Sequence, residues 1–243
     1  MKHFFHISLF FNFLCIICIA YAFIKIGSPS YIFYLIKNKG QGIVSLKKHK
    51  TSHLKTLPVV EGRIIMLGNS ITAECEWAEL LDNPKVLNRG VIGDGTTDIL
   101  NRLADVIVMK PKKIFLLIGV NDLLYLPLSK IIKNYEKIVN RLLLESPNTK
   151  LYLESVLPVH NSFRRNGMKN EDIDILNKNI EQIAQKQSLT YINLNTKFKS
   201  ILVTASGAWL EGGLNPEYSI DGIHLNGKGY LLFKDIISPY INN

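Results

Sequence analysis

From about residue 60 onward, short apolar runs alternate with longer segments in which apolar residues recur at helical spacing. The apolar runs predict strands at Arg63–Leu67, Val86–Leu87, Lys113–Ile118, Leu151–Val156 and Tyr191–Leu194. The periodic segments predict helices near Glu76–Leu81, Thr97–Val108, Leu128–Glu145, Glu171–Gln187 and Gly227–Ile237. Strands that alternate with helices are joined by crossovers and lie parallel. The pattern therefore predicts one α/β domain, a three-layer α/β/α sandwich around a mainly parallel five-stranded sheet.

Polar loops that contain glycine follow the first three predicted strands. The first strand runs into Gly68-Asn69-Ser70, the second is followed by residues 88–94, and the third ends in residues 119–122. In open parallel sheets, ligands bind beyond the carboxyl ends of the strands. The sequence therefore predicts a functional site at this edge of the sheet.

The N-terminus carries an apolar run from Phe4 to Ile26, interrupted by His6, Asn12 and Lys25. A membrane-spanning helix needs roughly 20 apolar residues, whereas the core of a signal peptide has about 7–15. The length of the run favours an anchor. Because residues 20–22 (Ala-Tyr-Ala) resemble a cleavage site, a cleaved signal peptide is the alternative.

These observations divide the chain into three expected parts. Residues 1–27 are a signal anchor or signal peptide, residues 28–58 a basic juxtamembrane linker, and residues 59–243 the α/β domain. We expect a membrane-anchored protein whose domain is exported to the periplasm or the cell exterior. Cleavage of the first part would instead yield a secreted protein.

The formal net charge of +9 is concentrated near the N-terminus. The first 60 residues hold eight lysines and no acidic residue, and the remainder carries 21 basic against 20 acidic side chains. Basic charge beside a predicted membrane segment suits anionic lipid or solvation, and the run Lys47-Lys-His-Lys50 is interpreted as a solvated tether. Nucleic-acid binding is disfavoured.

Cysteine and histidine usage indicates neither a disulfide framework nor a metal site. Cys15 and Cys18 lie inside the apolar run, where cysteine acts as a small hydrophobe, and Cys75 is expected to be a partly buried free thiol. Beyond the linker the only histidines are His160 and His224. Without a cysteine or carboxylate cluster beside them, no metal is expected.

Asp221-Gly-Ile-His224 is the segment that indicates chemistry most directly. On a tight turn through Gly222, the Asp221 carboxylate can hold the His224 ring in one tautomer, as a general base requires. Ser70, at the end of the first strand, is the candidate nucleophile. Its alternative role is to cap the next helix. Together these residues predict hydrolytic acyl transfer. His160 has no acid shortly upstream and is interpreted as a loop or pocket residue.

Gly93 and Asn121 are candidates for an oxyanion hole. A backbone N–H beside a residue without Cβ can approach a substrate closely, and an asparagine amide can donate to an oxyanion. The alternatives are a turn glycine and a loop cap. Support for a phosphate-binding role of Gly90, Gly93 and Gly95 is weak, because no Walker lysine follows them. The chain also lacks the G-x-S-x-G motif of α/β-hydrolases.

The sequence resembles the SGNH hydrolase superfamily, also called GDSL-type esterases and lipases. The family's four blocks appear in order as Gly68-Asn69-Ser70, Gly90 to Asp94, Gly119-Val-Asn121-Asp122 and Asp221-Gly-Ile-His224. The resemblance covers about residue 60 to the end and implies a flavodoxin-like fold. It further implies Ser70 as nucleophile, His224 as base and Asp221 as its orienting acid. The N–H groups of Ser70 and Gly93 and the Asn121 amide would form the oxyanion hole, with no cofactor.

Asn69 is the one departure, since the family usually has Asp there. The change removes a charge beside the nucleophile. The spacing of the blocks is most similar to the branch that resembles platelet-activating-factor acetylhydrolase subunits and bacterial carbohydrate O-acetylesterases.

The expected function is hydrolysis of small acyl esters, above all acetyl esters, on a substrate such as an acetylated glycan. A lysophospholipase, an acyltransferase using the same site and a non-hydrolytic glycan-binding protein are the alternatives. Substrate choice is expected to depend on Trp77, the 159–170 loop and the 205–218 segment. Side chains considered for the pocket are Phe163, Arg164, Arg165, Trp209 and Tyr218.

Overall fold

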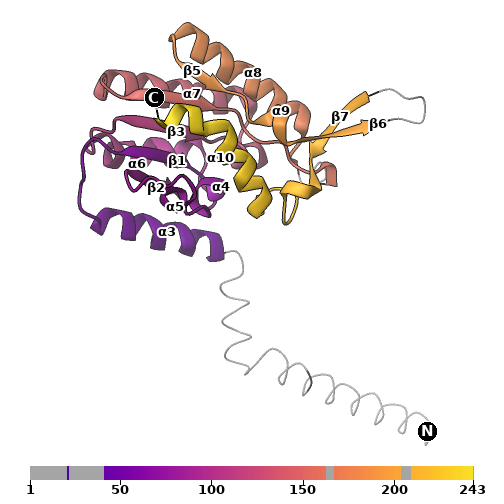
Figure 1. The fold of residues 1–243 in the computed structure, drawn as a ribbon, viewed down its shortest axis with the longest axis horizontal. Coiled ribbons are helices and arrows are strands. Elements are labelled where there is room, and N and C mark those ends of the chain that lie inside the picture. The colour runs from indigo at the N-terminus through magenta and orange to yellow at the C-terminus, as the bar shows by residue number, and fades with distance from the viewer. Residues whose placement is uncertain (1–20, 22–40, 163–166, 204–208, 243) are drawn as a thin grey trace, which may run out of the picture. The chain divides into compact units, whose positions relative to one another are not determined.

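The structure, a computed structural model, describes residue 21 and residues 41–162, 167–203 and 209–242 (Figure 1). The chain forms two units, Met1–Leu46 and Lys47–Asn243. Helix α3 (Gln41–Thr56) begins in the first unit, and from Lys47 onward it belongs to the second. Apart from Tyr21, the apolar run predicted as an anchor lies outside the described residues. None of the helices that are described is long and apolar enough to span a membrane.

A five-stranded parallel sheet forms the centre of the second unit and confirms the predicted architecture (Figure 1). Its strands follow the order β2-β1-β3-β4-β5, and every neighbouring pair is parallel. Their bounds are β1 Ile64–Gly68, β2 Val86–Gly90, β3 Lys113–Leu117, β4 Lys150–Glu154 and β5 Thr190–Ile192.

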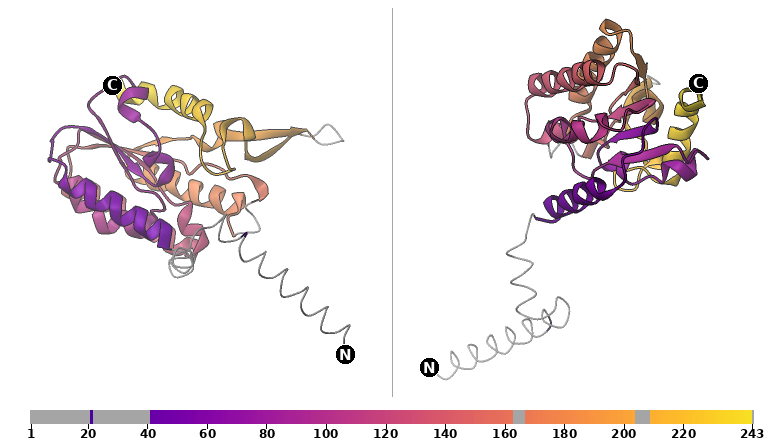
Figure 2. Two further views of the ribbon diagram at one scale, coloured as in Figure 1. Left: turned by 90° about the horizontal axis from the view of Figure 1, so that it is seen from below. Right: turned by 90° about the vertical axis from the view of Figure 1, so that its left-hand side faces the viewer.

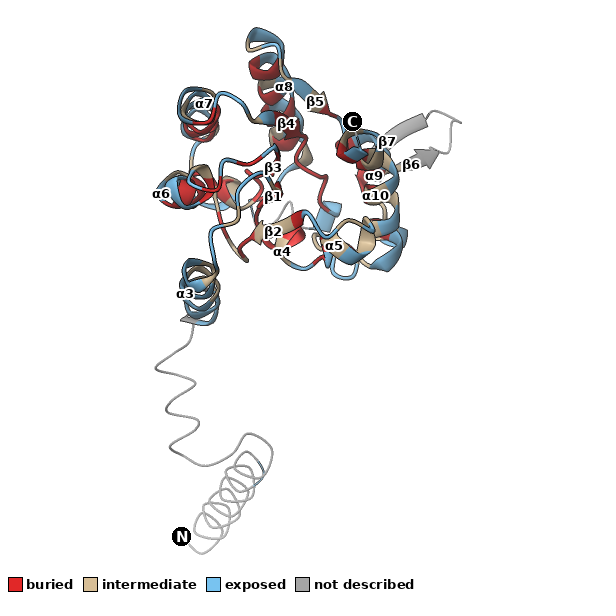
Figure 3. Ribbon diagram, turned by 60° about the vertical axis from the view of Figure 1, so that its left-hand side comes forward, coloured by how far each residue is buried: buried red, intermediate tan, exposed pale blue. Residues whose placement is uncertain are grey.

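Helices cover both faces of the sheet, because successive residues of the buried strands point to opposite faces. Ile65 and Leu67 of β1 pack with α6 (Thr96–Ile107), α7 (Leu128–Glu145) and α8 (Asn170–Lys186). Ile64 and Met66 pack on the other side with α4 (Ser70–Ala73), α5 (Trp77–Leu80), α9 (Asn195–Phe198) and α10 (Gly227–Asn242). The layers can be followed in two further views (Figure 2), and the buried residues of α6, α7 and α8 face the sheet (Figure 3).

Helix α3, the short helix α9 and an antiparallel pair of strands were not predicted. Helix α3 has a lysine-rich, largely polar sequence without a clear apolar stripe, so hydrophobic periodicity gave no sign of it. The antiparallel pair of β6 (Lys199–Val203) and β7 (Trp209–Leu214) lies apart from the main sheet. Short 3₁₀ turns occur at Asn121–Leu124 and Pro216–Tyr218.

The last helix continues beyond its predicted end at Ile237 and includes Pro239. A proline inside a helix removes one backbone donor. Here the ammonium group of Lys113, a buried residue of β3, donates to the carbonyls of Tyr240 (2.8 Å) and Ile241 (2.9 Å). A cation at the carbonyl end of a helix is favourable and helps α10 extend past the proline.

Trp77 belongs to the core, and its proposed place in a substrate pocket is wrong. Its side chain is 1% exposed and packs edge-on against Tyr230 and Phe233. The indole N–H donates to the Thr72 carbonyl at 2.8 Å. Cys75 is a buried free thiol, as expected. Burial, together with the nearby Glu76 charge, raises the pKa of its thiol to about 12.

Glu154, at the end of β4, is a buried acid whose burial opposes ionisation. It is 1% exposed, and its Oε1 has no hydrogen-bond partner among the described residues. Burial raises its pKa from 4.5 to about 8. The unfolded chain therefore loses this proton near pH 4.5, whereas the folded protein keeps it until about pH 8. The contribution of Glu154 to the free energy of unfolding is therefore fully present below pH 4.5. It is lost as the pH rises towards 8.

Glu154→Gln is accordingly expected to stabilise the protein at alkaline pH. Between pH 5 and 8.5 its advantage over wild type should grow by about 4 kcal/mol, or roughly 8–15 °C in Tm. Thermal unfolding at a series of pH values measures this. Glu136→Gln, an exposed change on α7, serves as the control and should follow the wild-type pH dependence. Parallel Tm curves for wild type and Glu154→Gln would contradict the prediction.

Candidate active site

The loops that follow β1, β2 and β3 meet at one edge of the sheet, as predicted. Gly68 of β1 pairs in register with Gly90 of β2 and Leu117 of β3, so the three strands end side by side. Ser70 follows the first, Gly93 the second and Asn121 the third. The Asp221–His224 segment immediately precedes α10.

Ser70 is the first residue of α4 and is 5% exposed. The chain turns sharply before it, and Gly68 is required there. A Cβ on Gly68 would collide with Thr72 Oγ1 and with the Leu117 carbonyl oxygen. Asn69 caps the helix, because its Oδ1 accepts a hydrogen bond from the Ile71 N–H at 3.1 Å. The strand-to-helix turn thereby presents the serine at the start of the helix.

Ser70, His224 and Asp221 form a continuous hydrogen-bonded chain. His224 Nε2 lies 3.0 Å from Ser70 Oγ, although the residues are 154 positions apart. His224 Nδ1 lies 2.7 Å from Asp221 Oδ2. The spacing is that expected for a nucleophile, a base and the group that orients the base.

A tight turn holds Asp221 and His224 together. Asp221 Oδ1 accepts hydrogen bonds from the backbone N–H groups of Ile223 (2.9 Å) and His224 (2.8 Å). Gly222 adopts a φ of +91° that few other residues tolerate. The Ser219 hydroxyl accepts from the Gly222 N–H and donates to the His224 carbonyl.

The same hydrogen bonds keep Asp221 ionised. Burial acts against the carboxylate, but bonds from the backbone and ring of His224 and from the Ile223 N–H outweigh it. Together they lower the pKa of Asp221 to about 2. The carboxylate therefore remains charged at every pH above that value and can hold a proton on His224 Nδ1.

The candidate oxyanion donors are available for a ligand. Within the described part of the chain, the backbone N–H groups of Ser70 and Gly93 donate no hydrogen bond. Gly93 has a φ of +76°, in the region that favours glycine. Asn121 Nδ2 donates to the Asp94 carbonyl at 2.9 Å, which leaves its second N–H without a hydrogen-bond acceptor among the described residues.

A sequence model of the GDSL-like lipase/acylhydrolase family matches residues 66–232. The chain belongs to this family. It is therefore a carboxylic ester hydrolase, in agreement with the resemblance seen in its four sequence blocks. The match begins at β1 and ends within α10, and so contains every residue of the candidate site.

Solved structures of other proteins share the fold. A Streptococcus pneumoniae protein provisionally described as a platelet activating factor is 26% identical, with a TM-score of 0.69 over 88% of this chain and 100% of its own. A GDSL-like lipase of Bacteroides thetaiotaomicron is 24% identical, with a TM-score of 0.67 over 81% and 97%. An acetyl xylan esterase is 19% identical, with a TM-score of 0.59 over 74% and 99%. No curated protein matches the chain.

His160 does not belong to the hydrogen-bonded chain of Ser70, His224 and Asp221. Its ring is exposed and bonds to the Ser162 hydroxyl at 2.9 Å, which agrees with its interpretation as a loop residue. Its backbone N–H donates to the Gly222 carbonyl at 2.8 Å, so the residue supports the His224 turn through the main chain. The described residues contain no group of three His, Cys, Asp or Glu side chains arranged to hold a metal ion.

The remaining pocket candidates divide into two groups. Tyr218 is half-buried and packs edge-on against Phe198, with ring centroids 5.8 Å apart. Phe163, Arg164 and Arg165 lie outside the described residues, and so does the side chain of Trp209. Substrate contacts in this region remain predictions.

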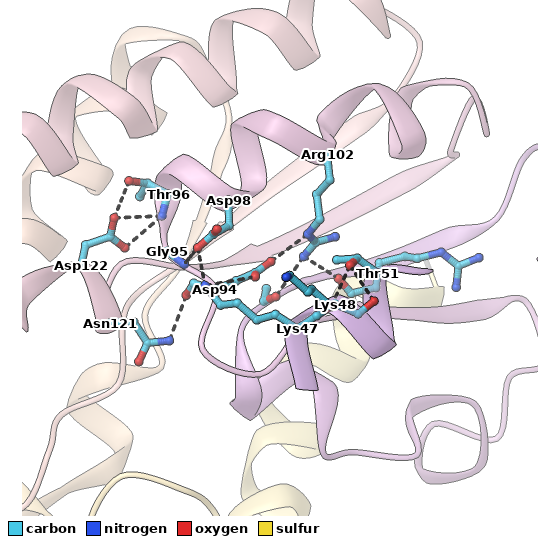
Figure 4. A network of polar contacts seen from close by, with 12 residues as sticks. Lys47, Lys48, Thr51, Asp94, Gly95, Thr96, Asp98, Arg102, Asn121 and Asp122 are labelled. Atoms are coloured by element: carbon cyan, nitrogen blue, oxygen red, sulfur yellow. Dashed lines mark hydrogen bonds and ion pairs between the residues drawn. The ribbon is translucent and has the colours of Figure 1, made fainter. Parts of the chain in front are cut away.

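A polar network around Asp94 and Asp122, which includes the candidate donor Asn121, was not predicted from the sequence (Figure 4). Asp94 pairs with Arg102, and Asp122 accepts hydrogen bonds from the backbone N–H and hydroxyl of Thr96. One signal was present in the sequence. Arg102 lies on the face of the helix that also carries Ile99 and Leu103, where a buried charge implies a partner.

Proposed function

We propose that the protein is a serine esterase that hydrolyses small acyl esters, with acetyl as the preferred acyl group. Ser70 is the nucleophile, His224 the general base and Asp221 the group that orients the base. The observation that supports this proposal most strongly is the hydrogen-bonded chain from Ser70 Oγ through the imidazole to the Asp221 carboxylate.

The reaction follows from these contacts. With a proton held on Nδ1 by Asp221, His224 Nε2 is free to accept the Ser70 proton as Oγ attacks the ester carbonyl. The carbonyl oxygen becomes an oxyanion, which the N–H groups of Ser70 and Gly93 and the Asn121 amide stabilise. His224 then protonates the leaving alcohol, and an acyl-enzyme ester remains on Ser70. Water, activated by the same imidazole, releases the carboxylic acid.

An acetylated carbohydrate is the substrate class we favour. One neighbour of the same fold is an acetyl xylan esterase. A polar cavity of about 360 Å³ adds support, since it is lined by amide and charged side chains that suit sugar hydroxyls, among them Asn161, Asn170, Glu171, Asp174 and Lys199. Asn161 directly follows His160, whose N–H contacts the His224 turn.

We further propose that the apolar N-terminal segment anchors the enzyme to a membrane and that the catalytic domain is exported. The basis is the length of the run from Phe4 to Ile26. Fractionation of cells that express the full chain, with protease protection of the domain, tests the location.

Acyl-chain preference and covalent labelling test the catalytic proposal. The full chain, purified in detergent, is assayed on p-nitrophenyl acetate, butyrate and octanoate, and a fluorophosphonate probe is applied with peptide mass mapping. We expect kcat/KM to fall at least about 10-fold from acetate to octanoate, because a small acyl pocket excludes long chains. The phosphonate is expected on Ser70 alone.

Each alternative gives a different result. Preference for octanoate favours a lysophospholipase, and ester formation with an added sugar acceptor favours an acyltransferase. Absence of both turnover and labelling would contradict the serine-esterase mechanism and favour a glycan-binding protein.

A further inference from the structure

Asp94 is a buried carboxylate in the β2–α6 loop (residues 91–95), one position after Gly93. Its side chain is 2% exposed, and two cations lie beside it. Arg102 Nε donates to Asp94 Oδ2 at 2.8 Å, and Lys47 Nζ lies 3.8 Å from Asp94 Oδ1 (Figure 4). A carboxylate at this depth must be paired, since an isolated buried charge is costly.

The guanidinium of Arg102 connects three parts of the site. Besides its bond to Asp94, Nη2 donates to the carbonyls of Gly68 (3.2 Å) and Arg89 (2.9 Å). Gly68 ends β1, two positions before Ser70, and Arg89 lies near the end of β2. One planar side chain therefore holds the β2–α6 loop against the strand that leads to the nucleophile. Its fixed fork of donors is a geometry that lysine cannot reproduce.

Asp94 transmits this restraint to Asn121. The Asp94 carbonyl accepts the hydrogen bond from Asn121 Nδ2 at 2.9 Å, while its side chain is held by Arg102. Asp94 is thus connected to two of the candidate oxyanion donors. It follows Gly93 in the chain, and its carbonyl is hydrogen-bonded to Asn121. A rotation of Asp94 would displace both donors together.

Helix α3 contributes to the same network. Lys47 Nζ contacts Asp98 Oδ2 at 2.6 Å, and this oxygen also accepts a hydrogen bond from the Gly95 N–H at 2.9 Å. On the other side of the loop, the Asp122 carboxylate holds Thr96. Lys47 precedes the region matched by the GDSL-like family, which starts at residue 66. Its side chain is 25% exposed and is paired with Asp98. The interpretation of Lys47 as part of a solvated tether is therefore incomplete.

We propose that Arg102 and, to a smaller extent, Lys47 are positioning residues that act through Asp94 to keep Gly93 and Asn121 aimed at the oxyanion. Neither side chain touches the reacting atoms. Their effect is to hold the donors in place before the reaction, which is what makes an oxyanion hole effective. This inference rests on the proposed serine-esterase function.

The test uses full-length Arg102→Lys, Arg102→Met and Lys47→Met with p-nitrophenyl acetate. For both Arg102 variants we expect kcat to fall about 10- to 100-fold with KM changed less than about 3-fold, because misplaced donors weaken only the transition state. The rate of fluorophosphonate labelling should fall by a similar factor. Lys47→Met should lower kcat about 3-fold, since its ion pairs are partly solvated.

Arg141→Met is the matched control. Arg141 is likewise an arginine that bonds to a backbone carbonyl and a carboxylate: it donates from α7 to the Leu100 carbonyl of α6 at 3.3 Å and to Glu145. Among the described residues it makes no bond to the β2–α6 loop. It should keep wild-type kcat and KM. A double mutant cycle with Asn121→Ala adds a second readout. If Arg102 acts through this donor, Arg102→Lys should cost much less in the Asn121→Ala background than in wild type.

The outcomes separate this inference from the function on which it rests. Folded Arg102→Lys protein with wild-type kcat, a rise in KM at unchanged kcat, or full additivity with Asn121→Ala would each overturn the positioning role. If neither Arg102 variant folds, Lys47→Met decides the proposal, and an unchanged kcat would overturn it. Wild-type protein that neither turns over esters nor takes the phosphonate would overturn the proposed function instead.

Discussion

Replacing Ser70 with alanine is expected to lower kcat for p-nitrophenyl acetate by at least about 10⁴-fold. The substitution removes the oxygen that attacks the carbonyl, so no acyl-enzyme can form. The side chain is small and 5% exposed, and among the described residues only the His224 side chain bonds to its hydroxyl, so the fold should remain intact. Initial rates, phosphonate labelling and a Tm within a few degrees of wild type measure these effects together.

Cys75→Ser is the control for Ser70→Ala. Cys75 is a thiol, and therefore a possible nucleophile by its chemistry, five positions along the chain from Ser70. Because burial raises the pKa of its thiol to about 12, almost no thiolate forms at neutral pH. Cys75→Ser should therefore retain activity. A Ser70→Ala protein with more than about one tenth of wild-type turnover would refute Ser70 as the nucleophile.

Replacing His224 with glutamine should lower kcat about 10³- to 10⁴-fold, the second largest effect that we expect. Glutamine has no basic nitrogen to accept the Ser70 proton, although it fills a similar volume. The Asp221 turn should survive, because Asp221 Oδ1 is bonded to backbone N–H groups that the substitution keeps. Steady-state kinetics at several pH values and the rate of phosphonate labelling provide the measurement.

His160→Gln is the matched control, since His160 is the only other histidine beyond residue 60. Its exposed ring contacts Ser162, and its contact with the His224 turn is made by the backbone. This variant should therefore keep activity within about 3-fold of wild type. The assignment of the base fails if His160→Gln is the inactive variant and His224→Gln is the active one.

The unusual Asn69 has a structural explanation. Its Oδ1 caps α4 by accepting the Ile71 N–H, a bond that the Asp usual in the family would make equally well. Asn69 is 1% exposed, so the neutral amide also avoids a buried charge beside Ser70. The substitution thus preserves the turn that presents the serine.

The spacing of apolar residues along the chain was sufficient to predict the sheet and its main helices. The strands in the centre of the sheet are continuous apolar runs, and α7 was predicted at its observed bounds, Leu128–Glu145, because its apolar residues recur at helical spacing. The Asp221–His224 contact was also foreseeable, because the two residues are three positions apart and Gly222 lies between them. Such features depend on neighbouring residues, which a sequence displays directly.

Contacts between distant residues were decided only by the tertiary structure. The sequence predicted that Ser70 and His224 act together, but only the fold brings these residues, 154 positions apart, within 3.0 Å of each other. Trp77 has a large aromatic side chain of the kind that often lines pockets, yet packing against Tyr230 and Phe233 places it in the core. The pairing of Lys47 and Arg102 around Asp94 joins a helix before the first strand to the loop after the second. The physical reason is that burial and charge pairing depend on the packing of whole elements, which no local pattern encodes.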